Sequence, residues 1–248
     1  MLKRGQITIF VILGIVLVVI VVLLFTLRRE ILPKNILPTQ TVSLQDHVED
    51  CIRESGNNAI NLVSKQGGEI NPGFYQMFQG NKVEYLCYTS NNFSSCFVRQ
   101  PFLQDHIEKE ISNYVNSNIK NCIDLNLWKD NGYSVSAGNM DVRTTIGRYD
   151  TIIILEYPVT ITKGDVTEAK SRFSYTSRVP LGRLIEVSDD IVNSETVSGV
   201  FYPVPYMLRN KGEVEIIRFW QGDSKIYRLN LKNGNYIFQF AVRGSVIP

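Results

Sequence analysis

The 248-residue sequence has little of the chemistry that common catalytic and metal sites use. It contains two histidines, His47 and His106, and none of its four cysteines belongs to a Cys-x-x-Cys pair, so the usual zinc spacings are absent. It also lacks the Gly-x-Ser-x-Gly motif, a glycine-rich phosphate loop, the dinucleotide-binding fingerprint and the His-Glu-x-x-His motif. We therefore expect a protein that is not an enzyme and that needs no cofactor.

An excess of charge of one sign is lacking as well. The chain has 26 basic and 24 acidic residues, a formal net charge of +2, and neither a basic patch nor an acidic tail. Nucleic acid is therefore not an expected partner. Aromatic residues are plentiful, with twelve Tyr and twelve Phe, which suits a folded domain rich in β-strands.

A long apolar run lies near the start of the sequence. Residues 7–27 carry no charge, and they lie between the basic pairs Lys3-Arg4 and Arg28-Arg29. A bilayer core of about 30 Å takes about 20 helical residues, whereas the apolar part of a cleaved secretory signal has only about 7–15. A buried core helix is the alternative interpretation. We predict a single-pass membrane protein with a basic leader at 1–6, a transmembrane helix at 7–29 and a linker at 30–42.

The four cysteines predict two disulfides in an oxidising exterior, although three pairings are possible in principle. We prefer Cys87–Cys96, because these residues flank a polar segment that resembles a hairpin tip. The other pair is then Cys51–Cys122, on the apolar faces of two expected helices. Four free thiols in a cytosolic domain are the alternative.

Because the flanking basic residues are nearly balanced, the cysteines decide the orientation that we expect. The N-terminus would be cytoplasmic, and the domain that follows the anchor would be extracellular. Asn92, in the sequence Asn-Phe-Ser, is a candidate glycosylation site at the tip between Cys87 and Cys96.

Residues 43–198 are expected to form an α+β ectodomain, in which two amphipathic helices cover an antiparallel sheet. Apolar stripes predict helices at 44–66 and 102–126, with Gly56 as a weak point of the first. A shorter third helix is expected around 184–192. Residues 201–206 contain two prolines and are expected to form a stiff linker. A small, separate β-meander is expected at 199–248. Alternating patterns and turn residues predict the strands at 133–137, 142–146, 151–161, 166–179, 213–220, 225–231 and 236–242.

A short repeat opens both long helices: residues 44–49 and 103–108 match almost residue for residue. Shared chemistry at helix starts explains such a match, because acidic residues suit a positive first turn. The alternative is a metal site built from His47 and His106, together with Asp46 and Asp105, since zinc accepts histidine and carboxylate ligands. That site requires the two helix starts to meet.

The segment Lys3-Arg-Gly-Gln-Ile-Thr-Ile-Phe10, followed by the apolar run, resembles the class III signal peptides of archaeal type IV pilin-like proteins. The resemblance covers about the first 27 residues. It implies that a membrane leader peptidase cuts between Gly5 and Gln6 and that the apolar helix stays on the mature chain as an anchor and filament core. Pilins usually carry glutamate at the fifth mature position, where this chain has Phe10.

Three functions remain open from the sequence. The leading hypothesis is a membrane-anchored surface protein that acts as a pilin-like filament subunit, a minor pilin or an adhesin, with membrane lipid and further copies of its own N-terminal helix as partners. The second is a single-pass, signal-anchored ectodomain that binds a partner without forming filaments, which Phe10 favours. The third is a surface metalloprotein or hydrolase that uses His47 and His106.

Overall fold

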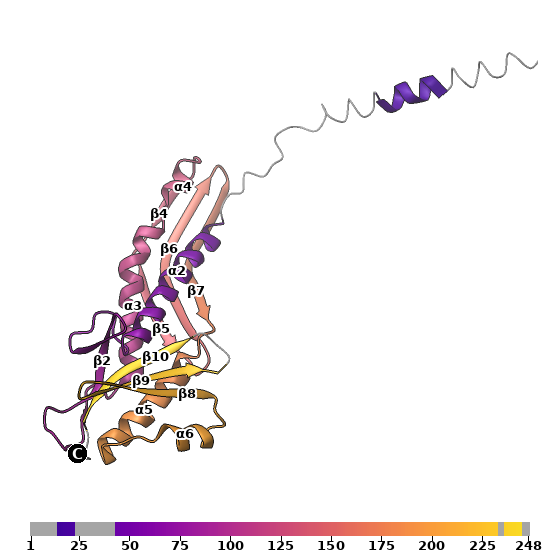
Figure 1. Ribbon diagram of the computed structural model, residues 1–248. Coiled ribbons are helices and arrows are strands. Elements are labelled where there is room, and N and C mark those ends of the chain that lie inside the picture. The colour runs from indigo at the N-terminus through magenta and orange to yellow at the C-terminus, as the bar shows by residue number, and fades with distance from the viewer. Residues whose placement is uncertain (1–13, 23–42, 233–235, 245–248) are drawn as a thin grey trace, which may run out of the picture. The chain divides into compact units, whose positions relative to one another are not determined.

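The computed structural model describes residues 14–22, 43–232 and 236–244 (Figure 1). The chain divides into two compact units, Met1–Ser43 and Leu44–Pro248. In the first unit, residues 14–22 are helical. The expected transmembrane helix at 7–29 extends past both ends of this segment, so most of it lies outside the described residues, as do Gly5 and Gln6. No helix within the described ranges is both long enough and apolar enough to cross a membrane.

Two long helices begin the second unit, close to where the apolar stripes predict them. They are α2 (Leu44–Lys65) and α3 (Leu103–Cys122). A disulfide joins Cys51 near the start of α2 to Cys122 at the end of α3, so the paired helices run in opposite directions (Figure 1). The helix expected to reach residue 126 stops earlier because Ile123 is extended, and the short helix α4 (Asn126–Lys129) follows.

Helices α2 and α3 cover a four-stranded antiparallel sheet (Figure 1). Its strand β6 pairs along one edge with β4 and β5 and along the other with β7. The pairing of β6 with β7 is interrupted between Glu156 and Val159, where Pro158 cannot donate a ladder hydrogen bond. The strands are β4 (Ser134–Ala137), β5 (Asp141–Ile146), β6 (Thr151–Lys163) and β7 (Val166–Ser177).

Gly56 lets α2 lie close to this sheet. A Cβ atom at this position would come within 2.4 Å of the Ile153 side chain on β6. The sequence suggests that Gly56 weakens the helix, since glycine has a low helix propensity. The structure gives it a packing role instead, because a larger residue here would require the end of the buried Ile153 side chain to move.

The expected C-terminal meander exists, but it is not separate. Strand β10 of the meander pairs in parallel with β2, near the start of the domain, and residues 44–248 form one compact unit. The boundary expected near residue 198 is therefore wrong, because hydrogen bonds between distant strands join the two segments. The resulting sheet contains β1 (Tyr75–Phe78), β2 (Asn81–Tyr88), β3 (Phe97–Val98), β8 (Val214–Gln221), β9 (Ser224–Leu231) and β10 (Ile237–Arg243).

Two further helices pack on this second sheet. Helix α5 (Leu181–Ser198) is longer than expected and contacts β2, β3 and β10. The stiff linker expected at 201–206 is largely helical, since α6 (Pro203–Arg209) begins there. Proline is compatible with the first turn of a helix, where its missing N–H is not needed. The fold is thus α+β, and one large core connects the helices of both sheets.

Candidate functional site

A turn after α2 brings a carboxylate to the start of α3. Gly67 and Gly68 both have positive φ angles, of 75° and 97°. A Cβ atom on Gly68 would lie 3.1 Å from the side chains of Leu103 and Ile107, so glycine allows the turn to pack directly on α3. The next residue, Glu69, is consequently held beside the first turn of that helix.

Glu69 meets two side chains of α3, His106 and Glu110. These two residues are four apart on the helix and therefore share a face. One potential ligand atom from each of the three residues lies within 4.8 Å of the others. We call Glu69, His106 and Glu110 the carboxylate–histidine cluster. All three residues are partly exposed, although Nε2 of His106 is itself closed to solvent.

Hydrogen bonds hold both carboxylates of this cluster. The backbone N–H of Ile70 donates to Oε2 of Glu110 at 2.9 Å, and the Gln100 side chain donates to Oε1 of Glu69 at 3.3 Å. Nε2 of His106 lies 2.9 Å from Oε1 of Glu69, but it makes no hydrogen bond and is closed to solvent. The imidazole nitrogen therefore faces a carboxylate without a directed bond.

Glu84 of β2 adds a third carboxylate next to this cluster, and its electrostatic field reaches Glu69 and His106. The side chain of Glu84 is buried, and burial raises the pKa of its carboxyl. The backbone N–H of Phe74 donates a hydrogen bond to this carboxylate, which lowers the pKa, and the negative charge of Glu69 raises it. Arg99 supplies a positive charge, but its nearest nitrogen is 3.9 Å from Glu84.

The structure does not bring His47 and His106 together. His47 lies near Cys51, where the disulfide ties the start of α2 to the end of α3, and its ring lies 5.5 Å from that of Trp128. His106 lies at the other end of α3, about 24 Å away at 1.5 Å per residue. The alternative metal site with Asp46 and Asp105 therefore does not form, since antiparallel packing separates the two helix starts.

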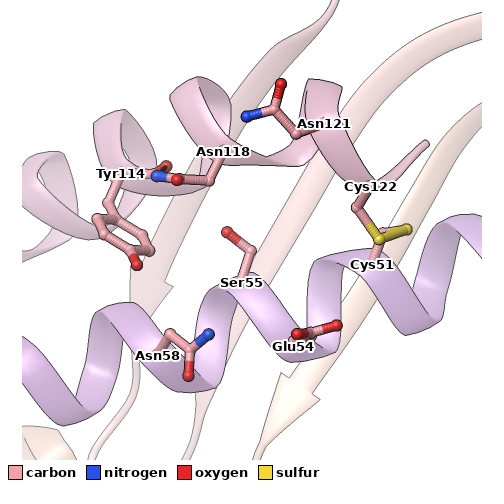
Figure 2. A pocket seen from close by; sticks show the side chains of 8 residues that line it. All are labelled: Cys51, Glu54, Ser55, Asn58, Tyr114, Asn118, Asn121 and Cys122. Atoms are coloured by element: carbon pink, nitrogen blue, oxygen red, sulfur yellow. Dashed lines mark hydrogen bonds between the residues drawn. A yellow bond between two sulfur atoms is a disulfide. The ribbon is translucent and has the colours of Figure 1, made fainter. Parts of the chain in front are cut away.

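A groove runs between α2 and α3 next to the Cys51–Cys122 disulfide (Figure 2). We call it the α2–α3 groove, and its volume is about 380 Å³. Figure 2 shows the Ser55 side chain directed from α2 into the space between the helices. Ser55 is only 8 % exposed, and its hydroxyl has no hydrogen-bond partner. The remaining lining residues are mostly polar: Glu54, Asn58, Tyr114, Asn118 and Asn121.

A second group of charged residues is enclosed between α5 and β9. Glu195 accepts hydrogen bonds from Lys225 and from the Tyr227 hydroxyl, and all three side chains are buried. Lys225 also donates to the carbonyl of Gly199 at 3.3 Å. Burial lowers the pKa of Lys225 and raises that of Tyr227. We call Glu195, Lys225 and Tyr227 the buried ion-pair cluster; its polar groups satisfy one another, and none of them lines a described cavity.

Both disulfides have the connectivity preferred from the sequence, with Cα–Cα distances of 5.7 Å for Cys51–Cys122 and 5.4 Å for Cys87–Cys96. The glycosylation candidate Asn92 is exposed in the loop that Cys87–Cys96 closes. That modification stays a prediction.

The sequence indicates His106 as a candidate ligand together with His47, Asp46 and Asp105. In the structure its neighbours are Glu69 and Glu110 instead. The spacing of His106 and Glu110 was a usable signal, because residues four apart share a helix face. Glu69 was harder to find, since its position depends on the turn at Gly67 and Gly68. A comparison with known proteins finds no matching family model, no matching curated protein and no similar solved structure.

Proposed function

We propose that this protein is a cell-surface structural protein of pilin-like type, anchored by one membrane helix at 7–29. Its N-terminus would be cytoplasmic, and the folded unit from Leu44 onward would be extracellular. A leader peptidase would cut between Gly5 and Gln6 and leave the apolar helix on the mature chain. Membrane lipid and other copies of that helix are the partners in this proposal.

One observation carries the proposal. Eight consecutive aliphatic residues, 15–22, lie in a helix, so apolar side chains lie on every side of this helix. Apolar surface costs about 25 cal/mol per Å² when it is left in water, so such a helix requires an apolar environment on all sides. A bilayer supplies this environment, and so does a bundle of identical helices.

The disulfides support the extracellular placement of the folded unit. All four cysteines of the chain are paired, and disulfides persist mainly in oxidising compartments. This argument bears on the compartment and is independent of the apolar helix.

Processing is tested by co-expressing the full chain with an archaeal class III leader peptidase and sequencing the mature N-terminus. We expect a chain that starts at Gln6. Gly5→Val should block cleavage, whereas Gly14→Ala, inside the apolar run, should leave it intact. A mature chain that retains Met1 in the presence of an active peptidase would contradict the processing step.

Assembly is tested separately by electron microscopy of cells that display a C-terminally tagged chain. Filaments that carry the tag would support a structural subunit. Membrane-bound protein without filaments would instead favour the second candidate, a tethered binding module. Phe10→Glu supplies the residue that pilins carry at this position, and we expect it to increase assembly if filaments form.

The second candidate function is supported by the α2–α3 groove. The buried Ser55 hydroxyl has no hydrogen-bond partner among the described residues, and the exposed residues Asn58, Asn118 and Asn121 also line this groove. Hydroxyl and amide groups, together with the Tyr114 ring, suit a small polyhydroxylated ligand such as a sugar.

A panel of monosaccharides and disaccharides, screened by NMR against the detergent-solubilised chain, tests this candidate. Binding should be lost in Asn118→Leu and kept in Asn57→Leu, a change on the exposed surface of α2 outside this groove. Absence of binding by every sugar in the panel would count against a sugar-binding module.

A further inference from the structure

We infer that Glu69, His106 and Glu110 form a binding site for one divalent transition-metal ion, with Zn²⁺ as the representative. This inference does not depend on the membrane anchor or on filament assembly. It rests on the geometry of three side chains within the compact unit that begins at Leu44.

The donor atoms are already close to the arrangement that a metal requires. Zinc binds imidazole nitrogen and carboxylate oxygen at about 2.0–2.2 Å, which places neighbouring ligand atoms about 3.3 Å apart in a tetrahedron. The three atoms here lie within 4.8 Å of one another, and Nε2 of His106 is 2.9 Å from Oε1 of Glu69. Small side-chain rotations are therefore sufficient to close the site around an ion.

The imidazole nitrogen makes no hydrogen bond that a metal ion would have to replace. Nε2 of His106 has no hydrogen bond and no contact with solvent. Oε1 of Glu69 lies 2.9 Å from this nitrogen, and a metal ion bound to both atoms would satisfy the nitrogen. His47 shares this lack of a hydrogen bond, but it packs against Trp128 and belongs to no described metal-ligand cluster.

The groups around the ligands resemble the outer shell of known metal sites. The N–H of Ile70 fixes the Glu110 carboxylate, and Gln100 donates to Glu69. Gln66 donates to the carbonyls of Glu69 and Ile70, at 3.1 and 2.7 Å, which fixes the turn itself. Such contacts orient ligands before the metal arrives and increase affinity.

The local charge also favours a cation. Glu69, Glu84 and Glu110 place three carboxylates in this region, opposed by Arg99, which is itself 41 % exposed and 3.9 Å from Glu84. A divalent ion would balance the excess negative charge. Three protein ligands leave a fourth position for water, as in open zinc sites.

The ligand types select among ions. Histidine nitrogen suits Zn²⁺, Co²⁺ and Ni²⁺, whereas Ca²⁺ and Mg²⁺ prefer sites made of oxygen alone. We therefore expect Zn²⁺ and Co²⁺ to bind in a one-to-one ratio and a large excess of Ca²⁺ or Mg²⁺ to leave them bound.

The test is titration of the full chain in detergent, first freed of metal by a chelator, with Zn²⁺ followed by calorimetry and with Co²⁺ followed by visible absorption. We expect one site per chain, and the Co²⁺ bands should disappear when Zn²⁺ is added. His106→Gln and Glu110→Gln should each weaken binding by at least about 100-fold, because removing a ligand does more than removing an outer-shell partner.

The repeat supplies a matched control. His47→Gln makes the same change in the nearly identical hexapeptide at the start of α2, and it should leave Zn²⁺ affinity unchanged. Glu168→Gln, at an exposed position of β7, is the carboxylate control. Circular dichroism shows whether each variant is folded, and Glu110→Gln keeps an acceptor for the N–H of Ile70, so at least one ligand variant should retain the fold.

Three results would overturn the inference. The first is an absence of saturable Zn²⁺ and Co²⁺ binding. The second is equal loss in His47→Gln and His106→Gln. The third is displacement of Zn²⁺ by a comparable concentration of Ca²⁺, which would mean that the acidic surface alone attracts cations. Failure to cleave after Gly5 or to form filaments would leave all three measurements unaffected.

Discussion

The carboxylate–histidine cluster and the buried ion-pair cluster both contain glutamate and a nitrogen base, but they differ in burial and in hydrogen bonding. In the buried ion-pair cluster, Glu195 is fully enclosed, and Lys225 and Tyr227 both donate to it. In the carboxylate–histidine cluster, the side chains of Glu69 and His106 are 19 % and 27 % exposed, and the imidazole nitrogen lacks a hydrogen bond.

This difference separates a structural role from a binding role. A buried charge is stable only when its partners satisfy it, so a complete cluster maintains the fold and offers little to a ligand. A partly exposed cluster of two carboxylates and an imidazole nitrogen that makes no hydrogen bond can gain from an added cation. Equal substitutions in the two clusters should therefore have unequal effects.

The largest expected effect is in the buried ion-pair cluster. Glu195→Gln should lower the free energy of unfolding by about 3–5 kcal/mol, because it leaves the Lys225 ammonium buried without a counter-charge. Urea unfolding measures this change. Adding Lys225→Met to the variant should restore much of the loss, and a double variant as unstable as the single one would contradict the explanation.

Removal of one hydrogen bond from the same cluster should have a smaller effect. Tyr227→Phe deletes the hydroxyl that donates to Glu195 and leaves a buried carboxylate oxygen with one partner fewer. We expect a loss of about 1–3 kcal/mol in the free energy of unfolding, measured at pH 7. Tyr175→Phe, which deletes an exposed hydroxyl bond to Asn57, serves as the control and should change stability much less.

The same tyrosine should also make stability depend on alkaline pH. Burial is the main reason that the pKa of Tyr227 is raised; Glu195 adds to the shift, and Arg218 opposes it. Below the unfolded pKa of about 10, this contribution to stability is fully present. Above it, the unfolded state loses the proton and the folded state keeps it, so stability falls by up to about 1.4 kcal/mol per pH unit.

Urea midpoints between pH 8 and pH 11 measure this dependence. The decline should be steeper for the natural chain than for Tyr227→Phe. Lys225, whose pKa is lowered, contributes with the opposite sign in both proteins. Parallel curves for the two proteins would show that Tyr227 does not titrate differently on unfolding.

The smallest expected effect comes from the matched substitution in the carboxylate–histidine cluster. Without metal, Glu110→Gln should change the free energy of unfolding by less than about 1 kcal/mol, because the glutamine oxygen can still accept the single hydrogen bond from the N–H of Ile70. Thermal unfolding with and without Zn²⁺ measures it, and only the natural chain should gain stability from Zn²⁺. A loss as large as that of Glu195→Gln would remove the distinction between the two clusters.

Local patterns predicted much of the fold. Apolar stripes located α2 and α3, and the polar segment between Cys87 and Cys96 indicated a disulfide across a hairpin. The irregularity between Glu156 and Val159 lies at Pro158, a residue that cannot donate to a strand ladder. These features depend on residues close in sequence, so the sequence alone is sufficient to predict them.

Pairing between segments far apart in the sequence could not be predicted. No local signal indicates that β10 lies beside β2 or that Glu195 of α5 meets Lys225 of β9. Lysine and glutamate are usually exposed, so a sequence alone does not predict that Lys225 and Glu195 are buried. The metal-ligand cluster was missed for a related reason, because Glu69 reaches His106 only through the packing of Gly68 on α3.

The parallel pairing of β10 with β2 also has a consequence for how the chain folds. Val242 lies beside Cys87, so β10, which is synthesised near the end of the chain, pairs with β2, which is synthesised much earlier. Such distant pairing slows folding, and an unfilled strand edge is prone to pair with other chains. During synthesis, β2 therefore has an open edge until residues 237–243 emerge. The Cys87–Cys96 crosslink, once oxidised, keeps β2 joined to β3 during that interval and limits the alternatives available to the nascent chain.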